Sequence, residues 1–449
     1  MMLDRAKLQP GTHHAGAPAQ SRPAWLVLFV LIIAYIFSFI DRQIIGLLVE
    51  PLKHDLGLSD TEVSLLQGFS FALVLAIAGL PLGRLIDRHR RLTIIAAGVT
   101  FWSLMTAGSG LASSYAALLL CRMGVGIGEA TLTPAAHSII ADSFPRKRLS
   151  LALGLYGTGP FLGQGLAYLI GAAVLAAVSH NPWINLPLFG ALRSWQIVFL
   201  AVGLPGLLVA VWVALLREPR RQATQEASHL SLRDVVQFFR KNFSAMLLVN
   251  LCLAFAAMTS YSASAWVPSF FIRSFGWSAP QAGAAFGPIV MAFGLLGAIL
   301  GGVFADFVAK RHASGRLLVM AVASLLAAPF AAIAPLIADA YWTLALLAVL
   351  VFLTTVAIGI GPSAQQAIVP GSMRGVTSAL GVLMVSLIGL GLGPTTIALV
   401  TDHVFGDPAK LRYSLACLTP FMLLLSSGFG FAGLRPYRRC VLNMSPSRE

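Results

Sequence analysis

Two full charges interrupt an otherwise apolar stretch of the chain, CRMGVGIGEATLTP at residues 121–134. Arg122 and Glu129 lie seven residues apart in it, and two helical turns bring positions seven apart back to nearly the same face. A second acid and base, Asp41 and Arg42, interrupt another apolar stretch. A charge at the centre of a membrane costs about 2.5–3.5 kcal/mol on insertion scales, so such residues are usually paired and functional. These four residues are the first candidates for chemistry.

Reversible proton binding is the chemistry that such a cluster can perform. Burial raises the pKa of a carboxylate and a nearby Arg lowers it, so a helix movement that separates the two changes proton affinity. We expect Asp41 and Glu129 to bind protons, with Arg122 and Arg42 holding their charged forms. Because Arg122 and Glu129 are too far apart to pair along one helix, Asp41 on a neighbouring span is the acid available to Arg122. The alternative is a static ion pair that only fixes helix packing.

Membrane-spanning helices must position these charges. Hydrophobic residues make up 57% of the 449-residue chain and charged residues only 11%, with a mean hydropathy of +0.81, which excludes an ordinary soluble domain. Apolar runs without period-two alternation exclude a β-barrel, so the predicted fold is all-α. A span needs about 20 residues. About twelve are predicted, with approximate limits 25–47, 61–83, 92–112, 116–140, 149–178, 195–216, 242–271, 281–305, 317–336, 341–366, 376–400 and 413–433.

The distribution of Lys and Arg predicts the orientation. With the N-terminus in the cytoplasm, 24 of the 31 Lys and Arg residues fall on the cytoplasmic side and five on the opposite side, as the positive-inside rule requires. We therefore expect a multi-pass protein of the cell membrane with both termini cytoplasmic. The net charge of +14 follows from this topology and attracts anionic membrane lipids, so it requires no nucleic-acid partner.

The longest polar segment divides the spans into six and six. The expected parts are a cytoplasmic tail at 1–24, a six-helix bundle at 25–216, a cytoplasmic linker at 217–241, a second bundle at 242–433 and a cytoplasmic tail at 434–449.

The two halves also echo one another in sequence. GRLID at 83–87 resembles GVFAD at 302–306, GIGEA at 126–130 resembles GIGPS at 359–363, and GTGP at 157–160 resembles GLGP at 391–394. Similar offsets of 219, 233 and 234 residues indicate a duplication. Two pseudo-symmetric bundles around a central cavity are a common transporter plan.

The segment GRLIDRHRRL at 83–92 resembles the loop signature of the major facilitator superfamily, with His89 where that family usually has Gly. Within the superfamily, IDRQ at 40–43, GIGEA with IIADSFP at 139–145, and GLYGTGPFLGQG at 154–165 resemble the Spinster family of lipid transporters. The resemblance covers nearly all of the N-terminal half and is weaker in the C-terminal half. It implies the major facilitator fold and a lipid-like substrate.

The same resemblance implies a cytoplasmic gate, in which Asp87 near a helix end meets basic partners across the interface and stabilises the outward-open state. The positive-inside rule alone explains the Arg residues but not this acid. Asp142 with Arg146 and Arg148, and Asp306 with Lys310 and Arg311, look like companion charges at equivalent ends. The expected gate residues are Asp87, Arg84, Arg88, Arg91, Asp142, Arg146 and Asp306.

The C-terminal half carries no Asp, Glu, Lys or Arg inside its six predicted spans. Its wall of a central cavity must therefore be apolar with neutral polar groups, whereas the other wall is charged, which suits an amphipathic substrate with a polar head and a hydrocarbon body. Each candidate alone is more readily explained by packing. The cavity candidates are Gln67, Tyr156, Gln164, Tyr261, Ser264, Trp266, Phe270, Gln365 and Gln366.

Together these patterns predict a proton-coupled secondary active transporter that moves an amphipathic, lipid-like or organic small molecule by alternating access. The sequence shows no phosphate loop, metal-ligand cluster or nucleophile arrangement, so we expect no enzyme, no metal and no cofactor beyond the coupling proton. We expect a monomer whose partners are the small amphipathic substrate and membrane lipids. The alternatives are a proton-independent uniporter or multidrug-type exporter on the same fold, and a non-transporting membrane receptor.

Overall fold

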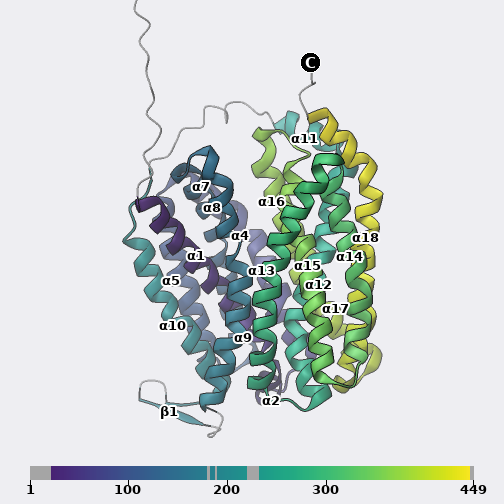
Figure 1. Ribbon diagram of the computed structural model, residues 1–449. Coiled ribbons are helices and arrows are strands. Elements are labelled where there is room, and N and C mark those ends of the chain that lie inside the picture. Colours follow the sequence, from purple (N-terminus) through teal and green to yellow (C-terminus); the bar gives the residue numbers. More distant parts are fainter. Residues whose placement is uncertain (1–21, 179–182, 188–189, 220–231, 445–449) are drawn as a thin grey trace, which may run out of the picture.

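The computed structural model describes residues 22–178, 183–187, 190–219 and 232–444, and this part of the chain is almost entirely helical (Figure 1). Within it, twelve segments are long and apolar enough to cross a membrane. The prediction of an all-α membrane protein with twelve spans is therefore confirmed. The spans are Ala24–Gly46, Asp60–Gly79, Arg91–Ser109, Tyr115–Ser143, Lys147–Val178, Ser194–Ala214, Phe243–Phe275, Ala279–Arg311, Gly315–Leu336, Ala340–Gln366, Arg374–Phe405 and Pro408–Met444.

Several spans of the N-terminal half consist of two or more helical segments in series. The α-helix of the fourth span is interrupted directly after Glu129, where the Thr131 hydroxyl donates to the Gly128 carbonyl. The helices of this half are α1 (Arg22–Gln43), η1 (Ile44–Gly46), α2 (Val49–Leu56), α3 (Asp60–Ser64), η2 (Leu65–Phe69), α4 (Ser70–Arg88), α5 (Arg91–Ser109), α6 (Tyr115–Glu129), α7 (Leu132–Ser143), α8 (Arg146–Tyr156), α9 (Gly159–Val178) and α10 (Ser194–Ala214).

The C-terminal half has longer continuous helices. Its eleventh span alternates between α-helix and the wider π-helix, which is uncommon and often marks functional sites. The helices of this half are α12 (Phe243–Phe275), α13 (Ala279–Arg311), α14 (Gly315–Ile333), η4 (Ala334–Leu336), α15 (Ala340–Gln366), η5 (Gly371–Met373), α16 (Arg374–Met384), η6 (Val385–Leu392), α17 (Gly393–Leu399), η7 (Val400–Phe405), η8 (Pro408–Lys410) and α18 (Leu411–Met444).

Three elements depart from the expected division of the chain. The polar linker predicted at 217–241 contains a helix, α11 (Leu232–Lys241), and α18 continues past the predicted start of the tail at residue 434. A short antiparallel hairpin, β1 (Ile184–Leu186) with β2 (Gly190–Leu192), lies between α9 and α10. We call the end of the bundle that carries α11 the linker side, and the end that carries this hairpin the hairpin side (Figure 1).

The two halves share one apolar core toward the hairpin side and have separate cores toward the linker side. One cluster joins Ile44 and Leu47 of the first half to Phe270 and Phe286 of the second. Two further clusters lie mainly in one half each, one around Ile139 and one around Tyr437. Apolar packing therefore closes the hairpin side of the interface.

Glycines allow the halves to approach closely along two seams. A side chain at Gly165 of α9 would meet Met291 and the Gly287 carbonyl of α13, and one at Gly68 of η2 would overlap the Leu390 carbonyl oxygen of η6. Helix backbones in direct contact are typical where small residues line a membrane interface. In Figure 1, α9 and α13 run side by side between the two bundles.

The repeated motifs fall at matching places in the two halves. GIGEA ends α6 in the fourth span and GIGPS lies near the end of α15 in the tenth. GTGP lies at the junction of α8 and α9 in the fifth span, and GLGP at the junction of η6 and α17 in the eleventh. Their positions are those expected for a duplicated six-helix unit.

Candidate functional site

The buried charges of the N-terminal half lie together between α1 and α6. The Arg42 guanidinium forms an ion pair with the Glu129 carboxylate, and the Ser38 hydroxyl donates to the same carboxylate oxygen at 2.8 Å. The Glu129 side chain is only 1% exposed. The guanidinium also lies over the rings of Phe39 and Phe71, 4.6 Å from each centroid. Ion pairing and cation–π contact together hold a cation that would otherwise be costly to bury.

Arg122 contacts the main chain of α1 and not the carboxylate expected for it. Its guanidinium donates to the carbonyl oxygens of Asp41 at 2.9 Å and Arg42 at 3.4 Å. These carbonyls belong to the last turn of α1, where a helix leaves its acceptors without internal partners. Arg122 therefore caps α1 from the neighbouring span, and the positive charge also suits the negative end of the helix dipole.

The Asp41 carboxyl is the unusual member of the cluster. The residue is 1% exposed, and neither carboxyl oxygen makes a hydrogen bond of normal geometry with the described residues. An ionised carboxylate without partners is strongly disfavoured in an apolar interior. The sequence thus correctly brought Asp41, Arg42, Arg122 and Glu129 into one region, but it gave Arg122 the wrong contact.

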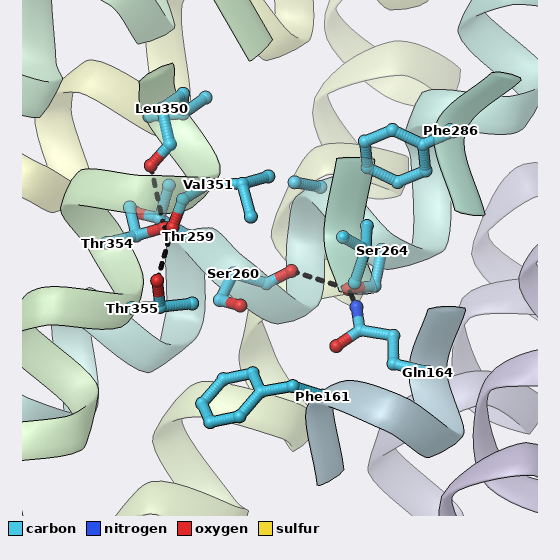
Figure 2. Close-up of a pocket in the computed structure, with 12 residues that line it drawn as sticks. Phe161, Gln164, Thr259, Ser260, Ser264, Phe286, Leu350, Val351, Thr354 and Thr355 are labelled. Carbon is cyan, nitrogen blue, oxygen red and sulfur yellow. Dashed lines mark hydrogen bonds between the residues drawn. The ribbon is translucent and has the colours of Figure 1, made fainter. Parts of the chain in front are cut away.

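A small cavity lies where α9 of the first half meets α12, α13 and α15 of the second (Figure 2). Gln164 donates to the Ser264 hydroxyl, and Ser264 donates in turn to the Ser260 carbonyl at 2.8 Å. Phe161 and Phe286 supply apolar surface, and no charged side chain lines it. Its free volume is about 20 Å³, enough for about one water molecule, so in this conformation it does not hold a larger ligand.

A network of charges joins the halves on the hairpin side. Arg273 at the end of α12 donates to Glu50 at 2.8 Å and to both Asp60 carboxylate oxygens at 2.7 Å. Lys53 also pairs with Asp60, and Asp402 accepts from the Thr61 amide and hydroxyl at 2.7 Å. Asp60 and the Arg273 side chain are almost fully buried. Bidentate, buried Arg–carboxylate contacts are geometrically specific, so they reinforce closure of the hairpin side.

The sequence profile of the Major Facilitator Superfamily matches residues 31–394. The chain belongs to this superfamily. An MFS-type efflux pump of Mycolicibacterium smegmatis is 28% identical over 442 residues, which cover 96% of this chain and 97% of the pump. A sphingosine-1-phosphate transporter of Danio rerio is 25% identical over 340 residues, 72% of this chain and 64% of that protein.

Solved structures agree with the sequence relatives. A bacterial homolog of the human lysosomal transporter Spinster, in an inward-facing and occupied conformation, has a TM-score of 0.76 and 28% identity, covering 96% of this chain and all of that chain. The chain is thus a Spinster-like major facilitator transporter. Its relatives are transporters and not enzymes, as predicted for this protein.

Three of the predicted gate residues, Arg91, Asp142 and Asp306, form ion pairs in the described part of the chain, and none of these pairs joins the two bundles. Arg91 is fully buried and pairs with Asp142 and Glu218. Asp306 pairs with Arg316 and not with the expected Lys310 or Arg311. Arg84 and Arg88 are exposed, and the side chains of Asp87 and Arg146 lie outside the described part.

The predicted cavity residues divide into several groups. Gln164 and Ser264 line the cavity, and Gln67 donates across the interface to the Ala265 carbonyl at 3.3 Å. Tyr261 of α12 packs against the N-terminal cluster that contains Phe71. The remaining residues take other places: Tyr156 stacks on Tyr35, Trp266 and Phe270 lie in the shared core, Gln365 bonds Asn250, and Gln366 is exposed.

Sequence reasoning missed the charge network on the hairpin side. Lys53 and Arg273 were counted only as cations on the less basic side. The positive-inside rule disfavours cations on this side of the membrane. Lys53 and Arg273 are stabilised there because both form ion pairs with the buried Asp60 carboxylate. Among the described residues, no group of His, Cys, Asp and Glu is arranged to hold a metal ion.

Proposed function

We propose that this transporter is a proton-coupled secondary carrier that moves an amphipathic, lipid-like small molecule across the membrane by alternating access. The observation that supports it most is the buried cluster in which the Asp41 carboxyl makes no hydrogen bond of normal geometry with the described residues while Glu129 pairs with Arg42. Protonation of Glu129 would remove its charge and release Arg42, and Tyr261 of α12 packs against the same region from the other half. Protonation of Glu129 would thereby alter contacts at the interface of the two bundles.

The substrate class follows from the contrast between the two walls. The charged cluster lies in the N-terminal half, and the cavity beside α12, α13 and α15 is lined by hydroxyl, amide and apolar groups. A molecule with one polar end and one hydrocarbon end would satisfy both walls. A relative that transports sphingosine-1-phosphate, an amphipathic lipid, supports this choice.

The proposed orientation places the linker side in the cytoplasm, with both termini there, in the cell membrane. The hairpin side, closed by Arg273 and by the shared core, then faces outward, and we propose on that basis an inward-facing conformation, the state named for the solved relative. On this proposal, rocking of the bundles brings the gate residues Asp87 and Arg91 against the other half in the outward-open state. We propose a monomer as the working unit, since each chain contains both bundles.

The test is transport in proteoliposomes. Labelled lysolipids, sphingoid compounds and cationic dyes are supplied with and without a pH gradient to the wild type, Asp41→Asn and Glu129→Gln. Gradient-driven flux of one amphipathic class is expected in the wild type and not in the two variants. Asp407→Asn is the matched control, because it removes a carboxylate that caps η8 and Asn caps a helix equally well.

The second candidate is a proton-independent uniporter or exporter of small organic molecules, which the efflux-pump relative favours. It predicts flux that ignores both the pH gradient and the Glu129→Gln substitution. In that case the buried charges would serve only to hold α1 against α6.

A further inference from the structure

Two buried donor groups of α5 face the Asp41 carboxyl. Trp102 and Thr106 are both 0% exposed. The Trp102 indole nitrogen and the Thr106 hydroxyl make no hydrogen bond of normal geometry with the described residues, yet they are the two donor side chains that interact with the Asp41 carboxyl. Nothing in the proposed transport cycle so far uses them.

Close packing of α5 on α6 explains how these side chains reach the site. Trp102 and Thr106 are four residues apart, so they share one face of α5. A side chain at Gly128 of α6 would lie 2.8 Å from the Trp102 Cβ atom, and one at Gly98 of α5 would overlap Thr131. The two glycines therefore let the backbone and Cβ atom of Trp102 lie directly against the turn that carries Glu129.

The hydrogen-bonding groups in this pocket are complementary. Within the described part of the chain, the two carboxyl oxygens of Asp41 have no hydrogen-bond donor, and the donor groups of Trp102 and Thr106 have no acceptor. Buried polar groups are nearly always paired, and leaving one unpaired costs about 1–3 kcal/mol. Pairing among these three side chains would satisfy all of these groups at once.

We propose that Trp102 and Thr106 are positioning residues of the proton site, which donate hydrogen bonds to ionised Asp41 and so set the pH at which it takes up a proton. The proposal rests on the proposed function, in which Asp41 binds the coupling proton. Trp102 can only donate, so it favours the ionised carboxyl specifically, whereas the Thr106 hydroxyl can also accept a bond from the protonated form.

The other titratable groups near Asp41 have separate partners or positions. Of the charged groups, Glu129 and Arg122 of α6 act on the Asp41 carboxyl, while Arg42 pairs with Glu129. The other titratable residues on helices packed against α1 have contacts or positions of their own. Tyr156 stacks on Tyr35 of α1, His137 contacts Tyr156, and Tyr168 of α9 bonds the Ser264 carbonyl. Asp142 of α7 pairs with Arg91, and Lys147 and Arg148 of α8 are exposed. The helix α10 has no titratable side chain.

The same helix supplies a matched control. The Ser103 hydroxyl is buried and also lacks a hydrogen bond to the described residues, but it faces α10, where a side chain at Gly206 would overlap it. Ser103→Ala thus removes an unpaired hydroxyl from α5 without touching the Asp41 pocket.

The experiment is an infrared pH titration of the full-length protein in phosphatidylcholine liposomes, which needs no substrate. The carboxylic-acid C=O band of protonated Asp41 is identified by its loss in Asp41→Asn. We expect its midpoint to move toward alkaline pH by about one unit in Thr106→Val and in Trp102→Phe, because losing a bond to the charged form favours the protonated form by roughly that much. Thr106→Ser, which keeps the hydroxyl, and Ser103→Ala should retain the wild-type midpoint.

Each other outcome has a definite meaning. An Asp41 band that titrates normally in Thr106→Val and Trp102→Phe, or an equal shift in Ser103→Ala, overturns the role of these donors and leaves the proposed function standing. A wild type in which no titrating band belongs to Asp41 contradicts the proposed proton site itself.

Discussion

At the scale of single residues, the four buried charges hold different positions in one cluster. Arg42 and Glu129 neutralise each other, the Asp41 carboxyl makes no hydrogen bond of normal geometry with the described residues, and Arg122 satisfies carbonyls at the end of α1. Arg42, Glu129 and Asp41 would change their interactions when a proton binds. Arg122 also acts on the Asp41 carboxyl, but it is bound to backbone that must be satisfied in every state, so it contributes to stability as well.

Replacing Arg122 by Met is expected to lower the free energy of unfolding by about 2–3 kcal/mol, because charge-assisted hydrogen bonds to buried carbonyls are lost. Arg412→Met is the control, since Arg412 also donates only to carbonyls, those of Pro335 and Ile337, but lies nearer the surface. Thermal unfolding in detergent measures both variants. Equal losses would contradict a special role for the cap on α1.

The sequence could predict which residues form the cluster but not which of them contact each other. Spacing along one helix fixes the faces of Arg122 and Glu129, and the structure keeps these two apart as expected. The pairing of Glu129 with Arg42 depends on how α1 is rotated against α6. That rotation is set by packing at positions such as Phe39 and Phe71, which no local pattern reports.

At the scale of elements, the seam between η2 and η6 joins two π-helical turns of opposite halves. The two elements can approach this closely because residue 68 is Gly, since any side chain there would overlap the Leu390 carbonyl. A wider helical turn also aims Gln67 at the Ala265 carbonyl across the interface. The seam therefore depends on both the glycine and the local helix geometry.

Gly68→Ala is expected to reduce transport about tenfold or more, since the added methyl forces backbone apart in the closed state, and overpacking of this kind typically costs 1–3 kcal/mol. Gly79→Ala on the next helix of the same span is the control, because its added methyl would meet nothing within 4 Å. Initial rates of uptake in proteoliposomes compare the two. Similar rates for both variants would show that transport does not depend on close contact between η2 and η6.

Elements with long apolar runs were predictable, and those without were not. All twelve spans follow from hydrophobic length. The helix α11 was missed because its apolar residues, including Phe238 and Phe239, lie within a segment whose overall composition is polar. The π-helical turns of η2 and η6 contact each other across the interface of the halves, and no local sequence pattern indicates them.

At the scale of the whole molecule, the two ends of the interface differ. The hairpin side has a shared apolar core and a buried charge network between the halves, whereas the described gate residues on the linker side pair within their own halves. Contacts that exist only when one side is closed favour that state by their full strength. Among the described residues, Arg273 makes both of the ion pairs that join the two halves, one with Glu50 and one with Asp60.

Arg273→Gln is therefore expected to shift the population toward a conformation open on the hairpin side. The ion pairs of Arg273 with Glu50 and Asp60 join the two halves and exist only when the hairpin side is closed. The substitution therefore destabilises the closed state and has little effect on the open state. The shift is measured as labelling of Ser64→Cys, a position that is fully buried in this conformation, by a membrane-impermeant maleimide with the exposed Cys417 replaced by Ser. A loss of about 1.4 kcal/mol from the closed state raises the labelling rate about tenfold.

Arg193→Gln provides the comparison that decides the interpretation. Arg193 also forms an ion pair on the hairpin side, but its partner Asp55 belongs to the same half. Opening the interface leaves that pair intact, so its removal should leave the labelling rate unchanged even if it lowers stability. Faster labelling in both variants would mean general loosening of that side, whereas faster labelling in Arg273→Gln alone identifies the ion pairs between the halves as the lock that alternating access must release.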